Sequence, residues 1–386
     1  MPNGPLDGIR IVDLTSVVLG PIATQVLADF GADVIKVETP DGDRMRTNGV
    51  SVQPGLSSIF VALNRNKRSL VLDLKQPQDR EALGRLIASA DVLVHNMRMR
   101  AIERLGFGYA AVQAINPRIV YCVGTGFGQD GPQAQRPAFD DIIQAASGLV
   151  ALASHSRDEL DYVPGLFADK ITGWALAQAI LAALVHRERH GEGQLVEVPM
   201  LETVSSFVLA EHLGGLAFPG SGEPWGYQRL LAGGRKPSRT LDGWIAFLPY
   251  TSRHWQAFFT CAGRPELIAE LGVNDRVHRN RHVKQLYRHM RELLRQRSTA
   301  EWLALSEVHD IPATPIVAVP EVPDHPQLKA VGLFQRREHP VAGPVLEMRP
   351  ATRFSRTPVT LRRHAPTTGQ HSAEILDELG LAPSQG

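Results

Sequence analysis

Strand and helix patterns alternate through the first third of the chain, and this alternation constrains the fold more than any other feature. The β-rich segments 8–14 and 32–38 flank a helical pattern that opens at Leu19 and stops at Gly31. Strand, helix and strand within about thirty residues make a βαβ unit. Further strands are predicted at 69–74, 91–95 and 118–123, with helices at 78–89 and 109–115. The sequence therefore predicts an α/β fold with a doubly wound parallel sheet, whose ligands bind outside the carboxyl ends of the strands.

The later part of the chain differs in composition and in its predicted elements. Helices are predicted at 141–149, 170–189 and 201–213, with a strand at 194–199 between the last two. A Gly- and Pro-rich stretch at 214–237 is typical of linkers and irregular loops. We predict a large domain over 1–225, a small domain over 226–320, and a Pro-rich, extended segment over 321–386 that ends in a helix at 372–379.

Composition limits the possible partners. The 41 basic residues balance the 40 acidic ones, which gives no general case for a nucleic acid or an anionic membrane. Two cysteines in 386 residues predict no disulfide framework. The N-terminus lacks the pattern of a secretion signal, and the apolar run from Trp174 to Val185 is too short to span a bilayer. We expect a soluble, cytoplasmic protein.

Several common cofactor-binding motifs are incomplete or absent. Gly124-Thr-Gly-Phe-Gly128 follows a strand but lacks the third glycine of a dinucleotide fingerprint, and no GxxxxGK[ST] phosphate loop exists. His278, His282 and His289 have helical spacing but stand among arginines and lysines, which favours a solvated basic face over a metal site.

Basic residues gather near the predicted strand ends. Asn64-Arg-Asn-Lys-Arg68 precedes one strand, and Lys75, Arg98, Arg100 and Arg104 follow later ones, close to Asn96. A solvated turn explains the first cluster as well as function does. Cations at successive strand ends also predict a site for a phosphate-bearing cofactor held without a glycine-rich loop.

Two sets of carboxylates stand at the starts of predicted helices. Asp140 and Asp141 open one helix, and Asp169 lies just before the long helix at 170–189. Capping of the helix N-terminus accounts for each of them locally. The local pattern does not decide between a capping role and a catalytic role.

Taken together, the motifs resemble those of the family III coenzyme A transferases, the group that also contains α-methylacyl-CoA racemase. The matching stretches run in order through nearly the whole chain, and together they are highly specific. They are 5–14, 31–38, 63–69, 72–74, Asn96, 103–106, 126–132, Phe139-Asp140, Gln144-Ala145, Ser147-Gly148, 191–194, 242–244 and His339-Pro340.

The resemblance implies a Rossmann-like large domain built from both ends of the chain, a smaller α+β domain in the middle, and an interlocked ring homodimer. CoA and acyl-CoA would be substrates together with small carboxylic acids, with no permanently bound cofactor and no metal. Asp169 falls at the position of the family's catalytic aspartate. The positions implied to line the CoA site are Val17, Val18, Leu72, Lys75, Asn96, Met97, Arg98, Arg104, Phe139 and Asp140.

We predict CoA transfer through a covalent aspartyl intermediate on Asp169, and Phe139 disfavours the alternative of racemisation. Racemisation needs a proton carrier on each face of the substrate, and the residue before Asp140, a histidine in the racemases, is Phe139 here. CoA transfer needs a single nucleophilic carboxylate, and we expect the helix N-terminus to hold the pKa of Asp169 low. The third possibility is a non-catalytic CoA-binding subunit. Arg44, Arg46 or Arg235 would anchor a second carboxylate if the acid carries one.

Overall fold

The computed structural model describes residues 4–155, 157–231 and 235–381, and these form two compact units. The larger unit contains residues up to 153, residues 160–208, and the chain from 326 onward. The smaller unit contains 154–159 and 209–325. The last part of the chain thus joins the same unit as the first.

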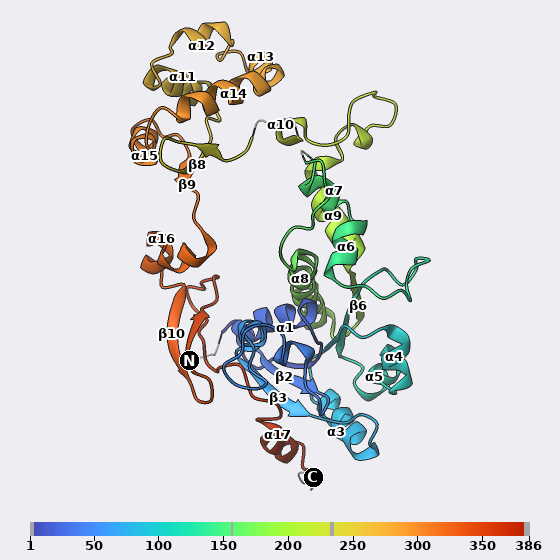
Figure 1. Cartoon of the computed structure of the whole chain (residues 1–386). Helices are drawn as coiled ribbons and strands as arrows, with labels where there is room; N and C mark the ends of the chain where they lie inside the picture. The colour runs from blue at the N-terminus through green and yellow to red at the C-terminus, as the bar shows by residue number, and fades with distance from the viewer. Residues whose placement is uncertain (1–3, 156, 232–234, 382–386) are drawn as a thin grey trace. The chain divides into compact units, whose positions relative to one another are not determined.

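A six-stranded sheet is the centre of the larger unit (Figure 1). All neighbouring strands in it run parallel, in the order β3-β2-β1-β4-β5-β6. The strands are β1 (Arg10–Leu14), β2 (Asp33–Glu38), β3 (Lys67–Val71), β4 (Val92–His95), β5 (Val120–Thr125) and β6 (Leu195–Pro199). The predicted α/β class with a parallel sheet is confirmed. The strand order reverses between β1 and β4, where folds of this type open a crevice for ligands.

Helices bury both faces of this sheet. Along β1, Ile11 belongs to one apolar cluster and Val12 to another, as expected for a strand that is covered on both sides. The helices of the larger unit that precede β6 are α1 (Leu19–Asp29), α2 (Ser58–Asn64), α3 (Pro77–Ala88), α4 (Met99–Arg104), α5 (Tyr109–Ile115), α6 (Asp140–Ala146), α7 (Leu149–Ala153) and α8 (Phe167–His190), with the 3-10 turn η1 (Arg44–Arg46).

Helix α8 is the longest element and begins beside the crevice. By length and composition alone it would be able to cross a membrane, and half of its most apolar window is buried in the structure. Leu176 and Ile180 pack into the core beneath α1, as in the core helix of a globular domain. Gly173 permits a close approach, since a Cβ there would lie 2.1 Å from Ile22 Cγ2. The second turn of α8 is therefore packed closely against the start of α1.

The C-terminal part of the chain contains more structure than the sequence predicts. An antiparallel hairpin pairs β10 (Phe334–His339) with β11 (Gly343–Met348), after the short helix α16 (Pro326–Ala330). The final helix α17 (Ser372–Glu378) places Ile375 and Leu376 in the core cluster next to β3. Strand β10 is mostly polar, and β11 begins with Gly-Pro, so neither has the apolar alternation that predicts a strand.

The smaller unit combines antiparallel strands with helices around an aromatic core. Strands β7 (Ser238–Arg239), β8 (Trp244–Phe247) and β9 (Ala313–Pro315) form one sheet. Trp255, Phe258 and Trp302 pack together beneath it. The remaining elements are α9 (Met200–His212), which leads into this unit, η2 (Gly214–Ala217), α10 (Gln228–Leu231), α11 (Ser252–Cys261), α12 (Glu266–Glu270), α13 (Arg276–Arg281), α14 (Val283–Leu294), α15 (Thr299–Val308) and η3 (Val319–Asp324).

Candidate active site

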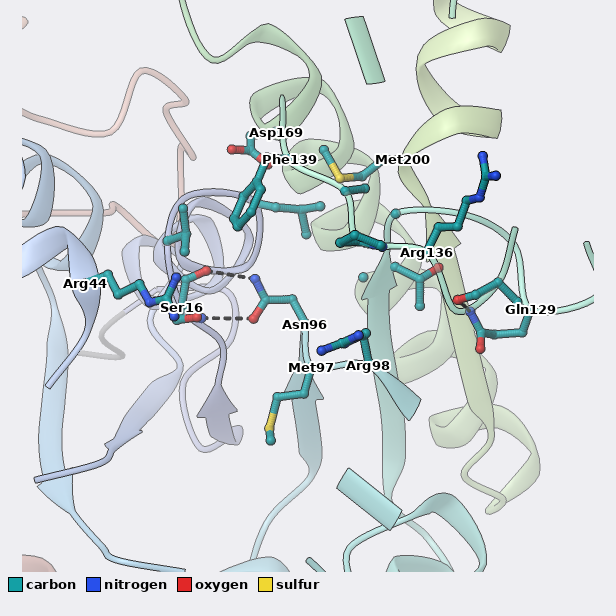
Figure 2. Close-up of a pocket in the computed structure, with 18 residues that line it drawn as sticks. Ser16, Arg44, Asn96, Met97, Arg98, Gln129, Arg136, Phe139, Asp169 and Met200 are labelled. Carbon is teal, nitrogen blue, oxygen red and sulfur yellow. Dashed lines mark hydrogen bonds between the residues drawn. The ribbon is translucent and has the colours of Figure 1, made fainter. Parts of the chain in front are cut away.

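A cavity of about 460 Å³ opens at the carboxyl edge of the sheet, where the strand order reverses. Its walls come from the turns after β1, β4 and β5, from η1, from the segment that leads into α6, and from the first turn of α8 (Figure 2). The lining residues are Ser16, Val17, Leu19, Arg44, Asn96, Met97, Arg98, Gly124, Thr125, Gly126, Gln129, Ala134, Arg136, Pro137, Ala138, Phe139, Asp169 and Met200.

The turns after β1 and β4 are joined across the crevice. The side-chain carbonyl of Asn96 accepts a hydrogen bond from the Ser16 N–H at 3.0 Å, and its Nδ2 donates to the Ser16 carbonyl at 2.7 Å (Figure 2). Asn96 was predicted as a CoA-binding residue. Its amide group is engaged with Ser16, so it shapes the crevice whatever else it contacts.

Asp169 lies in the first turn of α8 and contributes to the cavity wall with only 8% of its surface exposed. It does not cap this helix, because α8 begins at Phe167 and Leu166 occupies the N-cap position. The alternative of a helix-capping role for Asp169 is therefore excluded. The Asp169 N–H instead donates to Asp140 Oδ1 at 2.9 Å. A carboxylate from another helix thus satisfies one of the free N–H groups of α8.

Asp140 in turn is held by its own helix. Gln144 Nε2, one turn later on α6, donates to Asp140 Oδ2 at 2.6 Å and to the Gly165 carbonyl at 3.0 Å. Gln144 Oε1 accepts from the Val163 N–H at 3.0 Å. Asp140 also does not cap α6, whose N-cap is Phe139. Asp140 and Gln144 together fix the backbone that carries Asp169.

The acidity of Asp169 differs from the sequence expectation. Burial, followed by the nearby charges of Asp140 and Asp141, raises the pKa of Asp169 to about 7. The expectation of a low pKa is wrong, because burial and like charge outweigh the favourable helix terminus. Asp169 is therefore only partly ionised at neutral pH.

Glycines at the end of β5 form the back of the cavity. A Cβ at Gly124 would lie 2.5 Å from Leu19 Cδ2, and one at Gly126 would lie 2.4 Å from the Cβ of Ala138. The stretch 124–128 is no dinucleotide fingerprint, yet its glycines let neighbouring segments approach the strand end. Sequence reasoning did not place Gln129 or Arg136 in the site, although their position after a parallel strand was the available signal.

The remaining predicted CoA-site residues separate into two groups. Val17, Met97, Arg98 and Phe139 line the cavity beside Asn96 and Asp169. The others, Val18, Leu72, Lys75, Arg104 and Asp140, do not line it. The side chains of Val18 and Leu72 are buried in apolar clusters, while Arg104 is exposed at the end of α4. The role of each in CoA binding stays a prediction.

The cations of the basic cluster at the start of β3 pair with carboxylates inside the fold. Arg65 forms a buried ion pair with Asp29, and Lys67 Nζ lies 3.2 Å from Asp13 Oδ2. Arg68 pairs with Asp33 and with two glutamates of α17. The solvated-turn interpretation is wrong, because Arg65, Lys67 and Arg68 are buried, and these cations pair with carboxylates within the fold.

Two histidines of the smaller unit stack on each other. The rings of His278 and His282 stack 4.0 Å apart. Over the described parts of the chain, no three His, Cys, Asp or Glu side chains gather as metal ligands would.

Comparison with known sequences gives one consistent family. The model of CoA-transferase family III matches residues 6–372. Human succinyl-CoA:glutarate CoA-transferase is 32% identical over 97% of this chain and 86% of its own length. A succinate–glutarate CoA-transferase of Agrobacterium fabrum is 32% identical over 98% and 97%, respectively. A formyl-CoA:oxalate CoA-transferase of Rhodopseudomonas palustris is 31% identical over 98% and 95%.

Solved structures agree with these sequence matches. Rv3272 from Mycobacterium tuberculosis superimposes with a TM-score of 0.85 at 29% identity, covering 97% of this chain and all of that one. A CAIB/BAIF family protein from Brucella suis gives 0.83 at 31% identity, covering 98% and 100%. The fold is that of an α/β protein with a cavity at the carboxyl edge of a parallel sheet. The chain belongs to CoA-transferase family III and is a transferase.

Proposed function

We propose that this enzyme moves CoA from an acyl-CoA thioester to an acceptor carboxylic acid through covalent intermediates on Asp169. The Asp169 carboxylate attacks the thioester carbonyl, which forms a mixed anhydride and releases CoA thiolate. The thiolate then attacks the aspartyl carbonyl, which forms a β-aspartyl-CoA thioester and frees the donor acid. The acceptor carboxylate repeats these two steps in reverse, so that CoA leaves on the acceptor and Asp169 is restored.

The position of Asp169 is the observation that carries this proposal. It is the one carboxylate among the side chains that line the cavity in the described chain, and it faces the turns after β1, β4 and β5. Burial raises the pKa of Asp169 and also removes water from its carboxylate. A partly desolvated carboxylate is a stronger nucleophile than a solvated one once it is ionised.

Phe139 supports transfer over racemisation. Its ring lies at the cavity beside Asp169, with 60% of its surface exposed, and carries no exchangeable proton (Figure 2). An enzyme that removes and returns an α-proton needs a second acid/base group opposite the first. Covalent transfer needs no second acid/base group, so it fits this cavity wall better than racemisation does.

Arg44 is the candidate for recognising an acceptor with a second carboxylate. It lines the cavity from η1, and its side chain is exposed. Arg46 does not qualify, because it is buried in an ion pair with Glu38. A guanidinium at the cavity wall binds a carboxylate well. We therefore propose a dicarboxylate acceptor, a class that includes the glutarate named for two relatives.

The direct test is replacement and trapping of Asp169. Asp169→Ala should lose CoA exchange by at least about 10⁴-fold and still bind CoA. In the unaltered enzyme, acyl-CoA followed by hydroxylamine should convert Asp169 alone to a hydroxamate, detected by peptide mass spectrometry. Asp130→Asn is the matched control, because Asp130 is an exposed carboxylate of the loop after β5 that does not line the cavity. Retained turnover in Asp169→Ala, or an unlabelled Asp169, would show a different mechanism or a non-catalytic CoA-binding chain.

We further propose a homodimer, interlocked as the family resemblance implies, in the cytoplasm. Exposed aromatic side chains support association: Trp174 on α8 is 57% exposed and Phe207 on α9 is 61% exposed. Both cysteines are free, as is typical of proteins in the reducing cytoplasm. Light scattering after size exclusion tests the first point, since a monomer mass would contradict it, and cell fractionation tests the second.

A further inference from the structure

Val17 adopts a backbone conformation that is costly for its side chain. Its φ of +71° lies in the left-handed region, which β-branched residues rarely enter. Such strain costs about 1–3 kcal/mol and persists only where the surroundings enforce it. Val17 is also a wall of the cavity that contains Asp169. The strained turn therefore lies where the substrate would bind.

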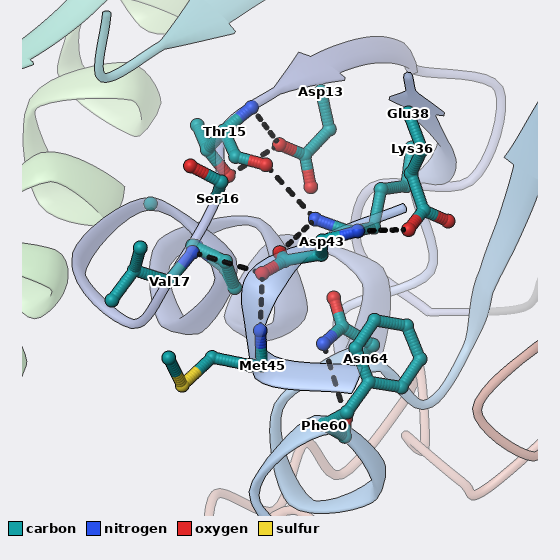
Figure 3. Close-up of polar contacts among 12 residues, drawn as sticks. Asp13, Thr15, Ser16, Val17, Lys36, Glu38, Asp43, Met45, Phe60 and Asn64 are labelled. Carbon is teal, nitrogen blue, oxygen red and sulfur yellow. Dashed lines mark hydrogen bonds and ion pairs between the residues drawn. The ribbon is translucent and has the colours of Figure 1, made fainter. Parts of the chain in front are cut away.

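A buried carboxylate holds this turn. Asp43 Oδ1 accepts hydrogen bonds from the Val17 N–H at 3.2 Å and from the Met45 N–H at 2.9 Å (Figure 3). The first bond fixes the turn after β1, and the second fixes η1, which carries Arg44. One oxygen atom thus sets the positions of two separate walls of the cavity.

The carboxylate is itself fixed by Lys36, a fully buried residue of β2. Lys36 Nζ lies 2.8 Å from Asp43 Oδ2 and donates to the Thr15 carbonyl at 2.9 Å. Burial alone would lower the pKa of Lys36, but Asp13, Asp43 and Glu38 together raise it, so the ammonium stays charged. The ion pair therefore connects the interior of the sheet with the turn on both sides of Ser16.

We propose that the Lys36–Asp43 ion pair is a positioning device that holds Val17 in its strained conformation and aligns the cavity wall opposite Asp169. A buried ion pair is weak evidence for stability, since apolar residues of similar volume often stabilise as well. The contacts of this pair reach backbone groups of two cavity walls. We therefore assign the pair a role in positioning these walls rather than in stability. The effect on turnover rests on the proposed transfer function, whereas the effect on the turn does not.

Asp43→Asn is the test variant, compared with Asp29→Asn as a matched control. An asparagine cannot accept from both Lys36 and the two N–H groups as the carboxylate does, so one side of the contact is lost. Asp29 also has a buried ion pair, with Arg65, and this pair lies outside the cavity wall. Hydrogen exchange of a peptide covering 14–20 should become faster in Asp43→Asn and stay unchanged in Asp29→Asn. Unchanged exchange in Asp43→Asn would overturn the proposal.

A double-mutant cycle with Val17→Gly separates positioning from simple destabilisation. Glycine adopts a φ of +71° without steric cost, so it removes the strain that Asp43 opposes. We expect Asp43→Asn to lower kcat/KM by about 10-fold or more in the unaltered background and by less than about 3-fold in the Val17→Gly background. Equal losses in both backgrounds would overturn positioning.

Two further outcomes are also decisive. If Asp43→Asn alone does not fold, the double variant is compared with Val17→Gly, and a loss of about 10-fold there counts against the proposal. If the unaltered enzyme transfers no CoA, the proposed function fails, while hydrogen exchange of the 14–20 peptide still decides this inference.

Discussion

Asp140 Oδ1 accepts a hydrogen bond of 2.9 Å from the backbone N–H of Asp169, so one carboxylate fixes the segment that carries the other. Gln144 completes the arrangement by binding both Asp140 and the loop before α8. The proposed nucleophile thus owes its position to a neighbouring helix. It also owes part of its raised pKa to the charge of that same neighbour.

Asp140→Ala should impair transfer without removing the nucleophile. The Asp169 N–H would lose its acceptor, and the first turn of α8 would shift, so kcat should fall by about 10- to 100-fold. Steady-state kinetics and circular dichroism would measure the loss and verify the fold. Ser147→Ala, at the C-cap of α6, is a suitable control. An Asp140→Ala enzyme with full activity would show that this contact does not matter.

The rate of transfer should follow the ionisation of Asp169. With a pKa of about 7, the nucleophilic carboxylate is roughly one-tenth formed at pH 6 and nine-tenths formed at pH 8. We expect kcat/KM to rise through this range. In Asp140→Asn the midpoint should move to lower pH, because one of the charges that oppose ionisation is gone. A flat profile between pH 6 and 8 would contradict the assignment, provided that chemistry limits the rate.

Asp169→Asn should stabilise the fold in alkaline solution. The folded-state pKa of Asp169 lies above its unfolded value, so ionisation costs stability progressively as the pH rises from about 4 to about 7. Removing the carboxylate should raise the free energy of unfolding by about 2–4 kcal/mol at pH 8 and by clearly less at pH 5. Thermal melts at the two pH values would show the difference. A stabilisation independent of pH would contradict the raised pKa.

Arg44→Met should change the preference between acceptor acids. The loss of the guanidinium should lower kcat/KM for a dicarboxylate by about 10- to 100-fold and leave a monocarboxylate of equal length within about 2-fold. Arg253→Met, an exposed arginine of the smaller unit, is the control. Equal losses for both acids would remove Arg44 from acceptor recognition.

Two arginines should differ in their effects on CoA. Arg98→Met should raise KM for acyl-CoA, with a smaller salt dependence than in the unaltered enzyme, because Arg98 lines the cavity. Arg68→Met should leave that KM unchanged and lower the melting temperature, because Arg68 pairs with Asp33 and α17. A reversal of these two effects would support the predicted ligand role of the basic cluster.

Periodicity alone was sufficient for the sheet. The segments that became β1, β2, β4 and β5 are short and β-rich, and the helices between them left few alternatives to a parallel layer. The hairpin β10–β11 and the short helix α2 were not predicted, because neither has a clear apolar repeat. For the site, the ordered motifs indicated Asp169, Asn96, Arg98 and Phe139. The structure places all four in the wall of one cavity, and their roles stay predictions.

What the sequence by itself determined was the α/β class, the family and the residue types of the cavity, since these follow from local pattern and from motifs in order. Only the tertiary structure decided which charged side chains form ion pairs inside the fold. Arg65, Lys67 and Lys36 differ little from Arg44 or Arg98 in sequence, yet burial pairs the first three with carboxylates and leaves the other two at the cavity. The pKa of Asp169 is likewise a tertiary property, because it depends on desolvation and on Asp140, which stands 29 residues away along the chain.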